Sequence, residues 1–161
     1  MKTVHLRGMA LAILTGLLVL ALRAQAQESD FRPLFNGKDF AGWKFIIEGK
    51  EAPPGQTFKV KDGIVVVSGS PNGYMQTDKS FKNYVLQFDW QYPKKSGNSG
   101  LLVHIQGPPP KGHWPKSVEV QGMHVDHGHI FAIIGAKGDF KTDKDAQKKA
   151  IKGVGEWKSH V

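Results

Sequence analysis

A single carboxylate stands between two valines in the short run Ser117-Val118-Glu119-Val120-Gln121. This alternation is typical of a β-strand that places Ser117, Glu119 and Gln121 on one face and the two valines on the other. A carboxylate fixed on a strand can serve as a general base, and partial burial would raise its pKa towards the useful range. The alternative is a salt-bridged surface carboxylate, which the sequence does not distinguish from a catalytic one.

Three more polar residues are candidates for acid–base or binding roles. His104 lies in the apolar run 101–105 and could be an acid, a base, a metal ligand or a structural residue. Asp89 is expected opposite the aromatic stripe of the alternating segment 84–92, and it is a second catalytic candidate. Asn98 lies in a turn-rich loop ahead of residue 101, where it either contacts a ligand or shapes the turn.

The segment that follows the Glu119 strand is rich in histidine. It reads His-Val-Asp-His-Gly-His and supplies His124, Asp126, His127 and His129. Neutral imidazoles and a carboxylate are ligands for zinc or a similar divalent ion, so this segment predicts a possible metal site. The competing interpretation is a polar loop that covers the site without a metal.

Polar side chains on neighbouring strands form a floor that suits a small polar ligand such as a sugar. Gln121 shares the predicted face of Glu119 and could bind a hydroxyl or carbonyl group of that ligand. Trp114 lies in a proline-flanked loop, and its indole could stack on a sugar face. Trp90 falls on the aromatic stripe of residues 84–92, which favours a place in the core.

The elements that must position these residues are mostly short strands separated by glycine and proline. The Asp62-Gly63 dipeptide between two β-rich runs predicts a hairpin. One helical turn is expected at residues 143–149, within a charged loop. Many short strands and no strong amphipathic helix predict an all-β sandwich or jelly roll. Strands are expected at 57–61, 64–68, 74–77, 84–92, 101–105, 117–121, 130–134 and, at its start only, 154–161.

Residues 1–26 have the pattern of a secretory signal peptide, which leaves residues 27–161 as one domain. Basic residues precede the apolar run 9–22, and Ala24-Gln25-Ala26 is a small-x-small cleavage pattern. The apolar run is short for a membrane span, so we expect a secreted or periplasmic protein with no membrane association after cleavage. Cleavage removes three basic residues and no acidic ones, which lowers the formal net charge from +8 to +5.

Composition excludes several classes of function. The 161 residues include no cysteine, so disulfides, thiolate metal ligands and a cysteine nucleophile are excluded. The remaining positive charge is interspersed with acidic residues near the C-terminus, which indicates a solvated surface rather than a nucleic-acid groove. Motifs of serine hydrolases, phosphate-binding loops and zinc proteases are absent from the sequence.

Four segments, occurring in the same order and with comparable spacing, resemble the motifs of the 3-keto-disaccharide hydrolase domain family, long catalogued as a domain of unknown function. These segments are Leu-Phe-Asn-Gly-Lys-Asp-Phe-Ala-Gly-Trp at 34–43, Gly-Asn-Ser-Gly-Leu-Leu-Val at 97–103, Ser-Val-Glu-Val-Gln at 117–121 and Gly-Val-Gly-Glu-Trp at 153–157. The resemblance implies a jelly roll of the concanavalin A-like lectin/glucanase type, export, and action on glycosides already oxidised to a ketone at C3. It also places the third motif on Glu119, which favours the role of general base.

Two departures from the family accompany the resemblance. His104 stands where the family often has arginine, and the family's domain continues well beyond Trp157. We therefore expect a C-terminally truncated form that is marginally stable or prone to aggregation, with a site that lacks residues from further strands.

The chemistry that the resemblance implies needs a base near C2, an acid near the glycosidic oxygen and a group that polarises the ketone. The hydrogen on C2 is acidic because the neighbouring carbon is a ketone, so elimination of the C1 substituent followed by hydration gives net hydrolysis. A noncatalytic carbohydrate-binding module on the same fold is the alternative. A direct glycosidase is a weaker third hypothesis, because no paired-acid motif is present.

Overall fold

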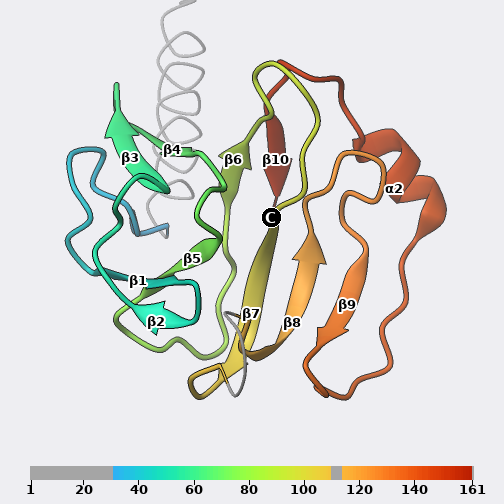
Figure 1. The fold of residues 1–161 in the computed structure, drawn as a ribbon. Helices are drawn as coiled ribbons and strands as arrows, with labels where there is room; N and C mark the ends of the chain where they lie inside the picture. The colour runs from blue at the N-terminus through green and yellow to red at the C-terminus, as the bar shows by residue number, and fades with distance from the viewer. Residues whose placement is uncertain (1–30, 110–113, 161) are drawn as a thin grey trace, which may run out of the picture. The chain divides into compact units, whose positions relative to one another are not determined.

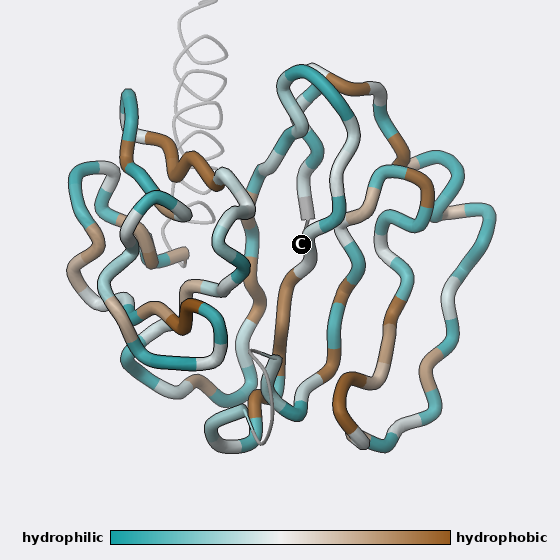
Figure 2. Tube along the Cα trace, in the orientation of Figure 1, coloured by the Kyte–Doolittle hydropathy of each residue, from teal (hydrophilic) through white to brown (hydrophobic). Residues whose placement is uncertain are grey.

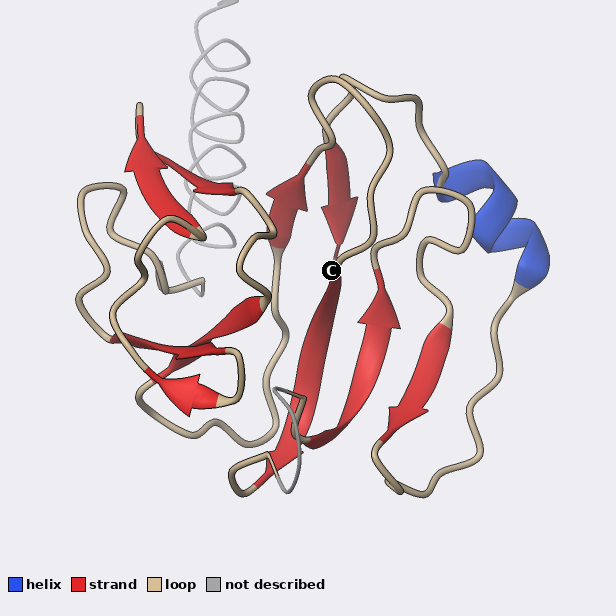
Figure 3. Ribbon diagram, in the orientation of Figure 1, coloured by secondary structure: helices blue, strands red, loops and turns tan. Residues whose placement is uncertain are grey.

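The computed structural model describes residues 31–109 and 114–160, and it is built almost wholly from β-strands (Figure 1). The described residues include one short helix, coloured blue in Figure 3. The elements in chain order are β1 (Trp43–Ile47), β2 (Lys50–Glu51), β3 (Phe58–Lys61), β4 (Ile64–Val67), β5 (Gly73–Thr77), β6 (Phe88–Trp90), β7 (Gly100–Gln106), β8 (Lys116–Gln121), β9 (Ile130–Ile133), α2 (Lys144–Ala150) and β10 (Lys158–His160).

The chain divides into two compact units. Of the first unit, Met1–Asn36, the structure describes residues 31–36, which contain bends and no regular element. The second unit, Gly37–Val161, carries every element given above. The predicted signal peptide, residues 1–26, lies outside the described residues. No helix in the described ranges has the length and apolar character needed to cross a membrane.

The strands of the second unit form four small antiparallel sheets, which confirms the expected all-β class. The orders are β2-β1-β5, β10-β6, β3-β4 and β7-β8-β9. In the last of these, β8 is the central strand, so the Glu119 segment is hydrogen-bonded on both sides. A central strand cannot slip without breaking two ladders, and this fixes the face on which Glu119 lies.

The hairpin predicted at Asp62-Gly63 is confirmed. Strands β3 and β4 pair from Phe58↔Val67 to Lys61↔Ile64, which leaves those two residues as the turn. Both have positive φ, 51° at Asp62 and 75° at Gly63, as a type I′ turn requires. The apolar strand β4 is visible in Figure 2, yet Ile64, Val66 and Val67 stay 44%, 47% and 53% exposed.

The strand predicted at residues 84–92 is wrong in its extent. Only β6, Phe88–Trp90, is a strand, and its three residues pair with the three of β10. Tyr84 and Val85 lie outside any ladder and are 45% and 65% exposed. Alternation of side chains makes a strand possible, but a ladder partner is also needed to satisfy the backbone.

The hairpin formed by β1 and β2 is not among the strands expected from the sequence. Its turn is Glu48-Gly49, with φ 49° and 80°, which again fits a type I′ turn. The pairing includes Ile47↔Lys50 and reaches Ala52, whose N–H donates to the Phe45 carbonyl at 3.2 Å. Two prolines, residues 53 and 54, come next and have no N–H to continue the ladder. The two segments therefore separate beyond Ala52.

The buried apolar side chains of the described residues come from strands β1, β3 and β5. They are Phe45, Ile46, Phe58 and Tyr74, each at most 9% exposed. The Phe45 ring meets Phe40 edge-on at 4.8 Å between centroids and Phe58 at 5.2 Å. The core is small, so a single large side chain within it carries much of the packing.

Helix α2 follows the expected position closely. Asp143 is the N-cap, and its Oδ1 accepts from the N–H groups of Asp145 and Ala146 at 3.0 Å each. Such a cap satisfies backbone donors that the helix itself leaves free. Gln147 donates from Nε2 to the His127 carbonyl at 3.0 Å, which joins the helix to the histidine-rich loop.

Candidate functional site

Glu119 lies at the middle of β8, with apolar neighbours on both sides. Its register partners are Leu102 on β7 and Phe131 on β9, and directly opposed residues share a face of the sheet. The side chain is half-buried. This burial removes water from the carboxylate and raises its pKa above the ordinary value of 4.5. The predicted polar floor is therefore mixed: a carboxylate flanked by a leucine and a phenylalanine.

Gly100, the first residue of β7, provides the space for this carboxylate. A methyl group at Gly100 would overlap Oε1 of Glu119 and come within 2.9 Å of its Cγ and Cδ. The carboxylate thus lies over the backbone of Gly100, where the loop 96–99 joins the strand. Only glycine leaves this place open, which gives the second glycine of the Gly-Asn-Ser-Gly segment, Gly100, a direct structural role.

Gln121 does not present its full amide to a ligand. It is 8% exposed, and its Oε1 accepts from the N–H of Met123 at 2.8 Å. The Gln121 backbone N–H donates to His129, and its carbonyl accepts from Gly128, both at 2.7 Å. The side-chain carbonyl is therefore used to hold the turn after β8, and contact of Gln121 with a substrate group stays a prediction.

A pocket of about 280 Å³ adjoins this end of the sheet. Ser96 and Gly97 line it from the loop before β7, and Met123, His124 and Val125 line it from the loop after β8. The two loops are joined by the Gly122 N–H, which donates to the Ser99 carbonyl at 2.7 Å. Gly100 follows the first loop directly. This loop therefore connects the pocket to the residue over which the Glu119 carboxylate lies.

His124 has one of its ring nitrogens buried and the other accessible. Nδ1 is buried without a hydrogen-bond partner. Nε2 is not among the buried unpaired atoms of the described residues, and no hydrogen bond involves it, so it is reachable from solvent. A buried N–H without a partner is costly, which favours the neutral tautomer that carries its proton on Nε2. His124 thus offers a hydrogen-bond donor beside the pocket.

The other predicted catalytic residues, Asp89 and His104, lie on different strands from Glu119. Asp89 is on β6, in a different sheet, and its Oδ1 accepts from the Ser159 hydroxyl at 2.6 Å. His104 is exposed and has φ 54°, at the irregularity in β7 between Val103 and Gln106. A non-glycine residue in this conformation at a bulge is strained, but the strain alone assigns no role.

The predicted binding residues Asn98 and Trp114 occupy different surroundings. Asn98 is exposed in the loop that leads to Gly100, close in sequence to the pocket residue Gly97. Trp114 stacks on Tyr74 of β5, with 6.2 Å between ring centroids and 23° between planes, and it remains 39% exposed. One face of the indole is therefore used in packing, and contact with a sugar stays a prediction.

The four residues of the predicted metal site do not form a ligand set. The His127 ring is 3% exposed and stacks on Trp90 at 5.2 Å, while the His129 ring stacks on Phe131 at 4.3 Å. Within residues 31–109 and 114–160, no group of three or more histidine, aspartate and glutamate side chains is placed to hold a metal ion. The structure therefore does not support ligation by His124, Asp126, His127 and His129, because ring packing directs two of the imidazoles to separate aromatic partners.

Removal of divalent metal is a direct test of this correction. We expect dialysis against a chelator to leave the rate of turnover unchanged, because the histidine-rich loop is held by packing and backbone hydrogen bonds. Elemental analysis of the purified protein should give less than about a tenth of an equivalent of any divalent ion. A stoichiometric metal whose removal lowers the rate would restore the metal hypothesis.

Sequence reasoning missed the packing around Trp90. The His127 ring lies against the Trp90 indole, with 10° between planes, and the Lys158 ammonium lies 5.2 Å from a Trp90 ring centroid. Lys158 is 1% exposed, and its Nζ donates to the Gly153 carbonyl at 3.1 Å. These contacts connect β6, β10 and the histidine-rich loop. The sequence signal that could have indicated these contacts is the position of Lys158, directly after the Gly-Glu-Trp segment.

The described residues combine an all-β fold with a partly desolvated carboxylate on the central strand of a sheet. The family model described as the 3-keto-alpha-glucoside-1,2-lyase-like domain matches residues 30–160. The chain therefore belongs to this family, which confirms the resemblance of its four motifs.

One solved structure is similar to this chain. A candidate glycosyl hydrolase from Parabacteroides distasonis is 27% identical, with a TM-score of 0.50. The match covers 78% of this chain and 59% of that protein, so the present chain spans less than two thirds of the solved one. No curated protein matches the sequence.

Proposed function

We propose that the protein is an exported enzyme that cleaves 3-keto-glycosides, with Glu119 as the general base. The observation that carries the proposal is the half-buried Glu119 carboxylate, which lies over Gly100, at the end of a loop that lines a pocket, and has a raised pKa. A base is most effective when its pKa approaches the working pH, and burial moves a carboxylate in that direction. The family description supports the 3-keto substrate class.

The proposed reaction proceeds in two steps. Glu119 removes the proton from C2, the C–H electron pair forms a C1=C2 double bond, and the C1–O bond breaks to release the aglycone. The departing oxygen takes up a proton. Water then adds across the double bond, with hydroxyl to C1 and hydrogen to C2, which completes a net hydrolysis. His124, with an accessible Nε2 beside the pocket, is assigned as a hydrogen-bond donor to a substrate oxygen.

The first test compares two substrates that differ only at C3. Incubation with a 3-keto-disaccharide and with its unoxidised parent should give turnover of the ketone alone. Binding of both without turnover of either would instead support a noncatalytic carbohydrate-binding module. Turnover of the parent would support a direct glycosidase, although the residues opposite Glu119 are Leu102 and Phe131 rather than a second carboxylate.

Three further statements complete the proposal. Residues 1–26 would direct export to the periplasm or the medium. The antiparallel sheets would belong to a jelly-roll sandwich of the concanavalin A-like type, in which a second layer covers apolar sheet surface. Exposed apolar side chains such as Val66, Val85 and Trp157 support a requirement for additional strands. A single sharp unfolding transition of a soluble monomer of residues 27–161 would contradict that requirement.

Gly100→Ala should lower turnover by about tenfold to 10²-fold, because the new methyl displaces the Glu119 carboxylate from its place and misplacement of a catalytic group has costs of this size. The measurement is kcat/KM for a 3-keto-disaccharide. In a Glu119→Gln background the same change should cost almost nothing further. Equal losses in both backgrounds would show that Gly100 does not act through the carboxylate.

The pH dependence of turnover should report the environment of Glu119. The base must be ionised, so kcat/KM should fall as the pH falls through its raised pKa, giving an acidic limb centred above 4.5. Replacing Leu102, its neighbour on β7, with asparagine should hydrate the carboxylate and move that limb towards lower pH. A limb that does not respond to this change would assign the titration to another group.

A further inference from the structure

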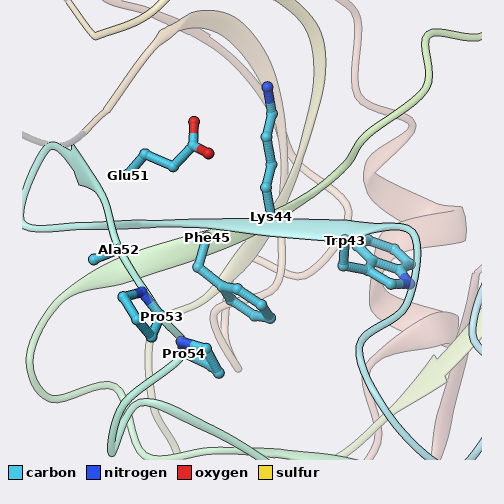
Figure 4. Close-up of a pocket in the computed structure, with 7 residues that line it drawn as sticks. All are labelled: Trp43, Lys44, Phe45, Glu51, Ala52, Pro53 and Pro54. Carbon is cyan, nitrogen blue, oxygen red and sulfur yellow. The ribbon is translucent and has the colours of Figure 1, made fainter.

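A second pocket, of about 470 Å³, lies on the β1–β2 hairpin, outside the sheet that carries Glu119 (Figure 4). Its volume is within the range of small-molecule sites, about 300–1,000 Å³. It opens where Pro53 and Pro54 end the ladder, so the segment after Ala52 diverges from Trp43–Phe45. The sequence itself therefore creates the cavity: a pair of residues without N–H groups separates two segments that a type I′ turn had brought together.

The two sides of the pocket differ in character. Figure 4 shows Lys44 and Glu51 extending to one side of β1, while Trp43 and Phe45 lie on the other side with the two prolines. Within the described residues no ion pair joins Lys44 to Glu51, so a group that only donates and a group that only accepts both remain available. A ligand that fits must combine an apolar face with groups that both donate and accept hydrogen bonds.

The shape of the pocket favours a compact ligand over an extended peptide. A peptide that added to the edge of β1 would need an open edge on both sides of its contact. That edge is closed at Phe45, whose carbonyl accepts from Ala52, and further along by the Ile46↔Glu51 and Ile47↔Lys50 pairs. The pocket is therefore blind at this end.

We infer that this pocket is a second carbohydrate-binding site, which takes an uncharged pyranose unit and is separate from the Glu119 site. A pyranose has a C–H face that suits an indole or proline ring, and neighbouring hydroxyls that each donate and accept hydrogen bonds. Lys44 and Glu51 supply one charge of each sign, which gives no preference for an anionic or cationic ligand.

The inference is tested with methyl α-glucoside, which lacks a ketone and is not a substrate in the proposed reaction. Titration of the ¹⁵N-labelled protein should shift the Trp43 indole and Ala52 amide signals, with saturation at millimolar concentrations. Glu51→Gln and Lys44→Met should each weaken this binding by about tenfold, because each removes a charge-assisted hydrogen bond, from the exposed Glu51 or the half-buried Lys44. Glu119→Gln should leave it unchanged.

Turnover separates this inference from the proposed function. Glu51→Gln should cleave a small 3-keto-disaccharide at the rate of the unaltered protein, since Glu51 lies outside the catalytic sheet. Shifts confined to Ser96, Gly97 and His124 would place sugar at the Glu119 site alone and overturn the inference. Titration with methyl α-glucoside to about 50-fold molar excess, up to about 100 mM, that shifts neither Trp43 nor Ala52 would also overturn the inference. Even the weakest affinities usual for such ligands should be detected at that concentration. Shifts by an extended peptide but not by the sugar would favour edge-strand binding instead.

Discussion

Glu119→Gln is expected to lower kcat for a 3-keto-disaccharide by about 10²–10⁴-fold, the contribution usually made by a general base. The amide keeps the size and packing of the side chain between Leu102 and Phe131 but cannot accept the C2 proton. Because it also removes a partly desolvated charge, the variant should fold at least as well as the unaltered protein. Steady-state kinetics and a denaturation curve on the same preparation give both quantities.

Glu48→Gln is the matched control for this substitution. Glu48 is exposed in the turn between β1 and β2, and the change removes the same charge without altering the Glu119 sheet. Its kcat should stay within about twofold of the unaltered protein, as is usual for surface changes remote from a site. Activity of Glu119→Gln within about threefold of the unaltered protein would remove Glu119 from the role of base.

Phe45→Ala is expected to lower the free energy of unfolding by about 3–5 kcal/mol, the usual range for a phenylalanine removed from a core. Phe45 is 5% exposed and packs against both Phe40 and Phe58. The described core holds few buried apolar side chains, so little neighbouring material can collapse into the cavity. Total stabilities of domains are about 5–15 kcal/mol, so much of this variant should be unfolded at 37 °C.

The measurement is a urea denaturation midpoint with its slope, compared with Phe81→Ala. Phe81 is 48% exposed and its ring meets Tyr84 edge-on at 6.3 Å between centroids, so its loss should cost less than about 1 kcal/mol. Similar losses for the two variants would mean that the core does not lie where β1, β3 and β5 place it.

Local signals predicted the elements whose structure depends on neighbouring residues. The Asp62-Gly63 turn needs only two residues that tolerate positive φ, and the Glu119 strand needs only its own alternation. Residues 84–87 are not in a strand because a ladder depends on a partner from elsewhere in the chain, which local alternation does not specify. The β1–β2 hairpin was missed because its second strand has two residues and ends at a proline pair.

The candidate site likewise combines features that local patterns predict with features that depend on remote residues. Glu119 could be selected from its strand, and its partial burial followed from the valines around it. The place of its carboxylate over Gly100 depends on the β7–β8 register, which no local pattern specifies. The histidine-rich segment invited a metal site because its ligand types are correct. The direction in which each imidazole ring faces depends on Trp90, which is remote in sequence, and on Phe131, which is on the next strand.

The central claim is that Glu119 removes the proton from C2 of a 3-keto-glycoside, and one isotope measurement tests it directly. The protein is incubated with a 3-keto-disaccharide in D₂O, and the released 3-keto sugar is examined by NMR at early times against an enzyme-free control for spontaneous exchange. Elimination followed by hydration predicts deuterium at C2 of the released sugar, and Glu119→Gln should suppress both release and labelling. Release of a sugar that keeps its original hydrogen at C2 would show direct cleavage of the glycosidic bond and contradict the account.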